Sequence, residues 1–360
     1  MSAGGLAFFP VLVVGTLMCV APASSRPTVQ FGVRVPRERT GAPVIRRERR
    51  AYYRRTAATA VCCVIVAVTV QGYWPFWLPR IILLPELAAD LCCFWVARRN
   101  IAAVKNADNW YAGLRPTIVT DTSWRTNPPR FPVRWLIPAL AVMAATAVVG
   151  ALRYPSLPAH IVTGSGHRVS KSAVSALVMA GQVYVTTVCS GLMLIVYRSR
   201  PDIEAADPAA STLRYRRFLA AMTRALLTLI ALVDTTLLLF ALRDWQVYRL
   251  SGIGRVLLVL PVAVGMLLLA AVARRTGQGG WRLNGNVRGL VLATGTDRDD
   301  DRFWKAGLLY VNRDDPAIMV GSRLGAGWTL NLGNPAAWLI VAGIVAAITG
   351  LAIIEAAAGM

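Results

Sequence analysis

Three acidic residues lie inside long apolar stretches, where a charged side chain is costly. Glu86 and Asp90 are four residues apart, so they share one face of a helix, and Asp234 lies in the middle of another apolar stretch. Such carboxylates either line a proton or cation path or pair with other polar groups. The sequence offers a loop arginine, Arg80, for the first two. For Asp234 it offers another polar group across helices, either near Thr235-Thr236 or on the 81–97 stretch that carries Glu86 and Asp90. Transport and structural pairing therefore both stay open.

Four of the six cysteines form two adjacent pairs, Cys62-Cys63 and Cys92-Cys93, in neighbouring apolar stretches. On antiparallel helices the two pairs would lie at similar depth, near the cytoplasmic ends, where four thiolates could bind a soft metal such as Cu(I). The alternative is that they are small apolar packing residues, as buried free cysteines usually are. We favour packing and expect no metal or other cofactor.

Carboxylates also gather near the C-terminus, within a segment rich in Asn, Gly and Trp. These residues are Asp297, Asp299, Asp300, Asp301, Asp314 and Asp315. A cluster of this kind could hold Ca²⁺ or Mg²⁺, but the order of ligands and the closing Glu of an EF-hand are missing. Because arginines are abundant nearby, we expect ion pairs instead.

The elements that position these residues are mostly membrane helices. Hydrophobic residues make up 56% of the chain and charged residues 16%, and the apolar residues form blocks approaching the roughly 20 residues that cross a bilayer. Eight such blocks occur: Gly5–Ala23, Thr56–Gln71, Ile81–Ala97, Trp135–Leu152, Ser172–Tyr197, Phe218–Leu242, Val256–Ala273 and Ala337–Ala356. We predict an all-α polytopic membrane protein with about eight transmembrane helices and a small cytoplasmic module that contains a β-hairpin.

The distribution of charge predicts how the chain is threaded. Of the 39 Lys and Arg residues, 31 lie in the segments that follow the first, third, fifth and seventh blocks. The positive-inside rule places these segments in the cytoplasm and both termini outside. A basic rim attracted to anionic lipid headgroups accounts for the net charge of +21, so we predict no nucleic-acid partner.

The first basic segment has two parts. Residues 26–36 alternate polar and apolar side chains between prolines and indicate a short extended piece. Residues 45–55 are strongly basic with helical composition, typical of a helix lying on lipid headgroups. Binding of a regulatory partner is the alternative.

The last basic segment contains short strand-like runs at 308–311 and 317–320, separated by turn-forming residues at 312–316. We predict that these two runs pair as a hairpin, with residues 327–331 as a third extended piece. A sheet this small cannot bury a core alone, so it needs the helix ends or the first basic segment as a second layer.

This segment resembles the C-terminal module known as domain of unknown function 5808. The matching residues occur in order: Trp304, Lys305, Gly307, Tyr310, Asn312, Asp314, Asp315, Pro316, Val320, Gly325, Gly327, Trp328, Thr329, Asn331 and Pro335. Ser322 and Leu324 depart from the basic residue and aromatic residue of that pattern. The resemblance implies a bacterial membrane protein of unassigned activity and supplies no catalytic residues.

A second resemblance involves the segment 153–172, predicted to face outside. Its Tyr-Pro-x-Leu-Pro start, central Gly and closing Ser-Lys-Ser are similar to the outer loop of domain of unknown function 1648, a family that includes the Sdp toxin immunity and signalling proteins. The family carries a Pro-x-His-aromatic motif where this chain has Val162-Thr-Gly164, so His160 and His167 take no role from it. Two histidines are also too few for a zinc site.

Together these features divide the chain into residues 1–273, a seven-helix region; residues 274–336, the segment with the module; and residues 337–360, the last helix. We expect a multi-pass protein of the bacterial inner membrane with an accessory, sensing or immunity-type role and a membrane or cytoplasmic protein partner. An enzymatic role is disfavoured because no complete catalytic set is evident. The alternative is a transporter whose path uses Glu86, Asp90 and Asp234.

Overall fold

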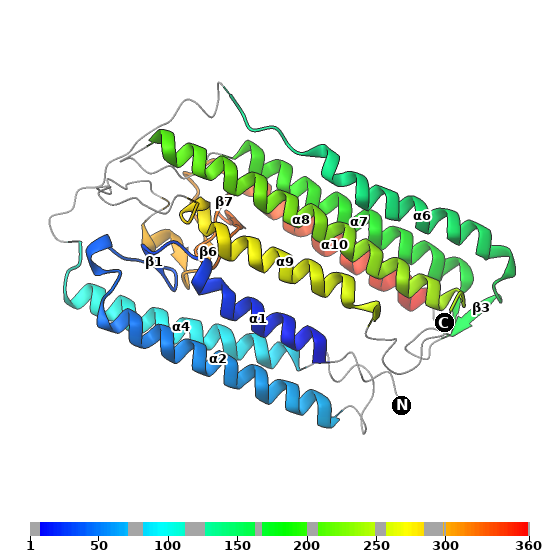
Figure 1. Cartoon of the computed structure of the whole chain (residues 1–360), viewed down its shortest axis with the longest axis horizontal. Helices are drawn as coiled ribbons and strands as arrows, with labels where there is room; N and C mark the ends of the chain where they lie inside the picture. Colours follow the sequence, from blue (N-terminus) through cyan, green and yellow to red (C-terminus); the bar gives the residue numbers. More distant parts are fainter. Residues whose placement is uncertain are drawn as a thin grey trace.

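The computed structural model describes residues 8–70, 82–111, 127–162, 168–199, 208–248, 257–283, 298 and 300–358. Within these residues the chain is mainly helical, and each predicted apolar block overlaps one α-helix (Figure 1). The helices are α1 (Phe8–Ser24), α2 (Pro43–Val70), α4 (Leu83–Ala107), α6 (Ile137–Arg153), α7 (Lys171–Arg198), α8 (Pro208–Asp244), α9 (Leu260–Thr276) and α10 (Pro335–Ala358).

Five of the described helices, α2, α6, α7, α8 and α9, are long and apolar enough to cross a membrane. Large apolar side chains are exposed along them, for example Leu152 and Leu267 at 75% and 63%. Exposed side chains of this size would be unfavourable in water and are favourable in lipid. The chain is therefore a multi-pass membrane protein by the length and composition of its helices.

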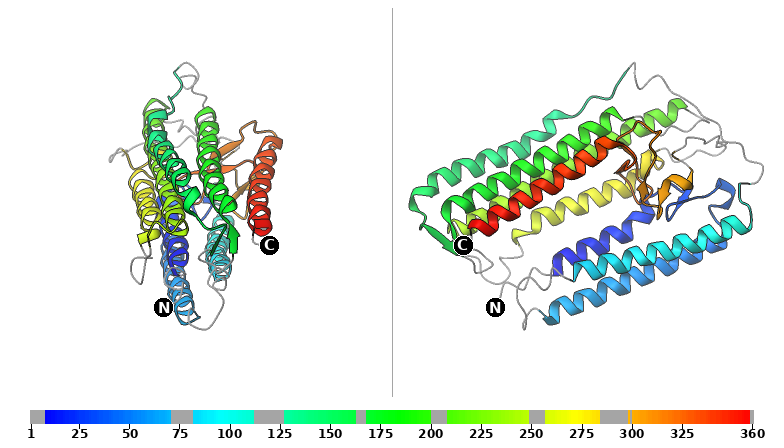
Figure 2. Two further views of the ribbon diagram at one scale, coloured as in Figure 1. Left: turned by 90° about the vertical axis from the view of Figure 1, so that its right-hand side faces the viewer. Right: turned by 180° about the vertical axis from the view of Figure 1, so that it is seen from behind.

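The helices form two groups that lie side by side (Figures 1 and 2). The first group contains α1, α2 and α4, which pack on one another; the second contains α6, α7, α8, α9 and α10. Contact between α1 and α9 joins the groups. Successive helices alternate in direction, so that α1 and α4 end where α2, α8 and α10 begin (Figure 1). We call this end of the bundle the module end.

Four antiparallel two-stranded hairpins accompany the helices. They are β1 (Val29–Gln30) with β2 (Val33–Arg34), β3 (His160–Val162) with β4 (Arg168–Ser170), β5 (Trp304–Lys305) with β6 (Leu309–Tyr310), and β7 (Met319–Gly321) with β8 (Trp328–Leu330). The β3–β4 hairpin lies at the end opposite the module end, and the other labelled strands lie at the module end (Figure 1).

The predicted pairing of residues 308–311 with 317–320 is wrong. Instead, β6 turns back onto β5 with Trp304 opposite Tyr310, and β7 pairs with β8 with Val320 opposite Thr329. The β5–β6 turn is tight because Ala306 and Gly307 adopt left-handed backbone conformations, with φ of 51° and 75°. Residues 312–316 therefore link two hairpins, which are joined by a parallel bridge between Tyr310 and Asn331.

The first basic segment agrees with its prediction only in part. Residues 26–36 contain the β1–β2 hairpin, as expected of an extended piece. The basic residues 45–55 do not form a separate surface helix, because they are the first turns of α2. The helix continues through them because Ile45 and Tyr52 are buried in a cluster with Phe94 and Ile101 of α4.

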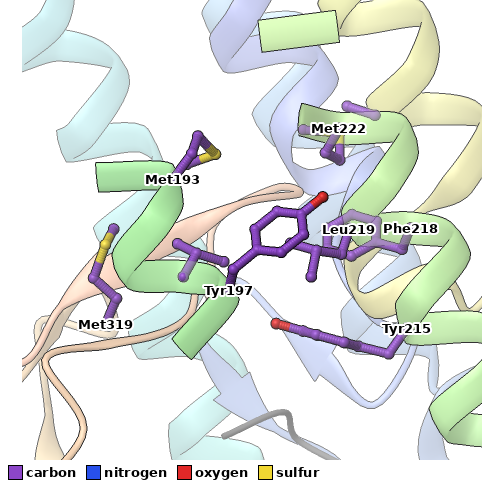
Figure 3. Packing of buried hydrophobic residues seen from close by; sticks show 9 residues of the cluster. Met193, Tyr197, Tyr215, Phe218, Leu219, Met222 and Met319 are labelled. Atoms are coloured by element: carbon purple, nitrogen blue, oxygen red, sulfur yellow. The ribbon is translucent and has the colours of Figure 1, made fainter. Parts of the chain in front are cut away.

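A second buried cluster connects the module to the second helix group (Figure 3). Met193 and Tyr197 of α7 face Tyr215 and Phe218 of α8, and Met319 of β7 joins the cluster from the side. The module therefore has the second layer that its small sheet requires, as predicted. That layer consists of the helix ends together with the β1–β2 hairpin.

We predict that Gly32→Ala destabilises the protein, whereas Gly41→Ala does not. Gly32 has a left-handed φ of 72°, and a Cβ there would come within 2.4 Å of the Gly307 carbonyl oxygen. Strain of this kind costs about 1–3 kcal/mol before the overlap is counted. No atom lies within 4 Å of a Cβ built at Gly41. Thermal unfolding of both variants in detergent tests this prediction. Equal melting temperatures for Gly32→Ala and Gly41→Ala would contradict the close contact between Gly32 and the Gly307 carbonyl.

Candidate functional site

The module has its own small aromatic and polar core. Tyr310 is completely buried, and its ring packs on Trp304 with centroids 5.1 Å apart. The Tyr310 hydroxyl donates to the Asp315 carboxylate at 3.1 Å. Arg298 pairs with the same carboxylate at 2.7 Å, and the Arg298 carbonyl accepts a hydrogen bond from the Trp304 indole, also at 2.7 Å. The residues that bear the family resemblance thus hold one another in place.

Asn331 closes the segment that links the two hairpins. Its side-chain oxygen accepts from the backbone N–H groups of Asn312 and Gly333, each at 3.0 Å. Its side-chain nitrogen donates to the carbonyls of Asn312, Asp315 and Ala317 at 2.9 to 3.1 Å. Asn331 is fully buried, so these bonds satisfy backbone groups that water cannot reach. An amide suits this position because its nitrogen carries two donor hydrogens and its oxygen has two acceptor lone pairs.

Asp301 and Arg323 attach the module to the first helix group. Asp301 pairs with the buried Arg323 and, at 2.6 Å, with Lys105 in the last turn of α4. Arg323 also donates to the Gly32 carbonyl at 2.8 Å, and Arg98 of α4 donates to the same oxygen at 2.7 Å. The β1–β2 hairpin, α4 and the module therefore meet at one cluster of charges.

This cluster keeps Asp301 ionised. Burial alone would raise the pKa of the Asp301 carboxyl, but the adjacent Arg323 and Lys105 outweigh burial, and the pKa lies below its ordinary value. The pKa of Asp315 is lowered in the same way, because burial is outweighed by hydrogen bonds from Arg298 and from the backbone of Ala317. These are the ion pairs that we predicted in place of a calcium or magnesium site.

The opposite side of the module attaches to the second helix group. The Trp328 indole donates to the Tyr215 hydroxyl of α8 at 3.0 Å. Gln278, just after α9, exchanges two hydrogen bonds with the backbone of Gly327, at 2.8 and 2.6 Å. A further bond goes to the first helix group, where Ser25, just after α1, accepts from the N–H of Gly325 at 2.9 Å. The module thus contacts both helix groups through specific polar bonds.

Other residues named from the sequence lie on the module surface. Lys305 is exposed and donates to the Arg302 carbonyl, and Asp314 and Pro316 are also exposed. Thr329 is half-buried in β8. Asp297 and Asp299 lie outside the described residues. Sequence analysis missed the docking residues outside the module, Arg98, Lys105, Tyr215 and Gln278, because nothing in their local sequence marks them.

Asp234 is held by α7. The Thr186 hydroxyl donates to its carboxylate at 2.9 Å, and the Gln182 amide donates to its main-chain carbonyl at 3.0 Å. The predicted neighbours play no part, since Thr235 and Thr236 donate to carbonyls of their own helix. In the described residues Asp234 therefore bonds to α7, a helix that the sequence did not single out, and its second carboxylate oxygen, Oδ1, has no hydrogen-bond partner.

Glu86 and Asp90 lie in the first helix group and are not brought together with Asp234. Both side chains are fully buried between α4 and its neighbours. The cysteine pairs lie in the same helix group, Cys62-Cys63 on α2 and Cys92-Cys93 on α4. One cysteine of each pair, Cys62 and Cys92, is exposed on the helix surface. Among the described residues, no group of three or more His, Cys, Asp or Glu side chains is placed to hold a metal ion.

The comparisons with known proteins identify only the module. The family of unknown function DUF5808 matches residues 313–338, which contain the linking segment, the β7–β8 hairpin, Arg323, Asn331 and the start of α10. The match confirms the stated resemblance over residues 313–338, and the residues quoted for it between Trp304 and Asn312 lie outside the match. No curated protein and no solved structure matches the chain. The resemblance of the 153–172 segment to domain of unknown function 1648 stays a prediction.

We predict that Asp301→Asn lowers stability in a pH-dependent way. The folded-state pKa of Asp301 is depressed, so its contribution is complete above the unfolded value of about 3.9 and is lost as pH falls through the lower folded value. At pH 7 the substitution should cost about 2 kcal/mol, the order expected for lost hydrogen bonds to charged groups. Unfolding of both proteins is followed from pH 7 to pH 2.

Asp314→Asn is the matched control, because Asp314 is exposed in the same module. The control should follow the wild-type protein at every pH. A penalty for Asp301→Asn that stays constant down to pH 2 would contradict the ion-pair assignment.

Proposed function

We propose that this chain is a non-enzymatic membrane protein with a sensing, accessory or immunity-type role, in which the module transmits changes between the two helix groups. The observation that carries this proposal is the double attachment of the module. Arg323 and Asp301 bind it to the first group, while Trp328 and Gly327 bind it to the second. A relative movement of the groups would have to strain or break one set of these bonds.

A direct connection to the far end of the bundle supports the proposal. The β3–β4 hairpin packs through Ile161 and Val169 on Trp245, just beyond the end of α8. Near its other end, α8 carries Tyr215, which bonds to Trp328 of the module. At 1.5 Å per residue, the part of α8 that lies between Tyr215 and Trp245 forms a rod of about 45 Å between these contacts. We infer that the effect of a signal or peptide binding at the β3–β4 hairpin is transmitted to the module through α8.

For the arrangement in the membrane, we propose eight spans in the inner membrane of a bacterium, with both termini outside and the module in the cytoplasm. The segments that carry 31 of the 39 basic residues connect helix ends at the module end. An orientation with the module end in the cytoplasm is therefore consistent with the positive-inside rule.

The exposed basic residues of the module end would contact anionic lipid headgroups, and the exposed face of the module would meet a protein partner. Relation to the Sdp immunity and signalling proteins is part of this proposal and depends on the resemblance of the 153–172 segment.

The competing proposal is a transporter that uses all three intramembrane carboxylates. It receives less support, because Asp234 bonds to Thr186 in the second helix group, whereas Glu86 and Asp90 lie in the first. A single path would have to connect two separately packed groups of helices.

We predict that a cysteine at Arg168 and one at Arg313 react from opposite sides of the membrane. Both positions are exposed, one in β4 and the other in the module. In a chain with its own six cysteines replaced by alanine, a membrane-impermeant thiol reagent should label Arg168→Cys in intact cells. Arg313→Cys should be labelled only after permeabilisation. The reverse pattern would overturn the orientation.

We further predict that Trp245→Ala increases hydrogen exchange of the β7–β8 amides several-fold while leaving those of α2 and α4 unchanged. Trp245 is almost fully buried under the hairpin, and its loss should loosen that end of α8. The α2 and α4 amides are an internal control, because global destabilisation would increase exchange in both places. Unchanged exchange in β7–β8 would contradict transmission through α8.

A further inference from the structure

Glu86 and Asp90 form a pair of carboxyl groups without a partner among the described residues, and Arg80, the loop arginine that the sequence offered, lies outside those residues. Neither side chain has measurable exposure, and all four carboxyl oxygens lack a hydrogen bond. Buried carboxylates are normally paired with cations or accept several hydrogen bonds. The carboxylates of the module, Asp301 and Asp315, follow that rule. The Glu86–Asp90 pair breaks it.

The pair lies at the centre of the first helix group. A Cβ built on Gly15 of α1 would come within 3.2 Å of Glu86 Oε1 and 2.9 Å of Ala60 of α2. Glu86 therefore points into the contact between α1, α2 and α4. Asp90 is one helical turn closer to the module end, on the same face of α4. The absence of a side chain on Gly15 leaves the space that the Glu86 carboxyl occupies.

The titratable groups that face the pair are themselves weak acids. They are Cys19 of α1, Tyr52 and Cys63 of α2, and Cys93 of α4. Arg55 acts on Cys93 but is itself exposed. Among the described residues, no Lys, Arg or His forms an ion pair with Glu86 or Asp90. Two negative charges on one buried helix face would repel each other with nothing to offset the repulsion.

We propose that Glu86 and Asp90 form a proton-binding site within the membrane, which holds at least one proton at neutral pH. The step is a simple transfer in which a hydronium ion gives its proton to a carboxylate and leaves as water. The bound proton removes one negative charge and supplies the donor that the second carboxyl lacks. This inference does not depend on the sensing role and applies equally to the competing transporter.

A line of buried polar side chains on α2 leads to the pair from the module end. Glu48, Tyr52 and Thr56 are spaced four residues apart and share one face of the helix. All three are buried, and Glu48 Oε2 has no hydrogen-bond partner. Tyr52 lies close enough to Asp90 to interact with it electrostatically. We infer that protons exchange with the site from the module end along this face.

A proton fits the site better than a metal ion. Hard cations such as Ca²⁺ and Mg²⁺ are bound by about six oxygen ligands. The described residues around the pair provide two carboxyl groups, and no third His, Cys, Asp or Glu is placed to complete a metal site.

The test is infrared spectroscopy of the full-length protein in liposomes, with Glu86→Gln, Asp90→Asn and the exposed-site control Asp314→Asn. The wild-type protein should show the C=O band of a protonated carboxyl at pH 7, shifted in D₂O and lost at high pH. Glu86→Gln and Asp90→Asn should each lose or shift this band, and Asp314→Asn should keep it. Because Asp234 is also buried, Asp234→Asn identifies its separate contribution.

Two outcomes would overturn the proposal. One is a band at pH 7 that neither Glu86→Gln nor Asp90→Asn alters. The other is a band that changes at constant pH when choline replaces Na⁺, K⁺ or Li⁺, which would assign the site to a metal cation. Folding is checked with the double variant Glu86→Gln/Asp90→Asn, whose neutral amides resemble protonated carboxyls. It should melt at or above the wild-type temperature, and a large decrease would show that the charged form is the native one.

Discussion

The arrangement of the module end depends on the burial of one guanidinium group. Arg323 is only 5% exposed, and a buried cation is tolerated only when it is paired and hydrogen-bonded. Asp301 supplies the charge, the Gly32 carbonyl accepts a hydrogen bond, and the Trp304 ring lies 4.6 Å from the guanidinium. These partners come from two separate parts of the chain, the turn between β1 and β2 and residues 301–304. The requirement to satisfy Arg323 therefore brings the β1–β2 hairpin and both parts of the module together, and Lys105 extends the cluster to α4.

The chain contains carboxylates in two contrasting environments. Asp301 and Asp315 are ionised, because arginines and backbone N–H groups stabilise the negative charge even though both are partly removed from water. Glu86 and Asp90 are more deeply buried and, within the described part of the chain, have neither kind of partner. The same side-chain chemistry thus builds rigid structure at the module end and leaves an unsatisfied pair inside the helices. The positions of the cations, nearly all of which lie outside the apolar blocks, account for the difference.

The module is better described as part of the bundle than as a separate domain. Its strands are two or three residues long, and Met319 of β7 lies in a buried cluster formed mainly by residues of α7 and α8. The segment that matches the family of unknown function contains Arg323, Trp328 and Asn331. Two of these dock the module onto the rest of the chain, and Asn331 holds its backbone together. The segment that matches the family therefore includes residues that attach the module to the rest of the chain.

The sequence by itself predicted a helix at each apolar block, and each block overlaps one α-helix of the described residues. Blocks of apolar residues can be recognised without knowledge of their packing partners. The sequence also determined that residues 26–36 are extended and that the module needs a second layer. The strand pairing was decided by tertiary structure, since two left-handed residues at 306–307 turn β6 back onto β5. Tertiary structure alone also decided that Asp234 meets Thr186, whereas Glu86 and Asp90 meet no partner among the residues that the structure describes. A sequence shows which residues carry charge, but whether a buried charge is satisfied depends on groups that only folding brings within hydrogen-bonding distance.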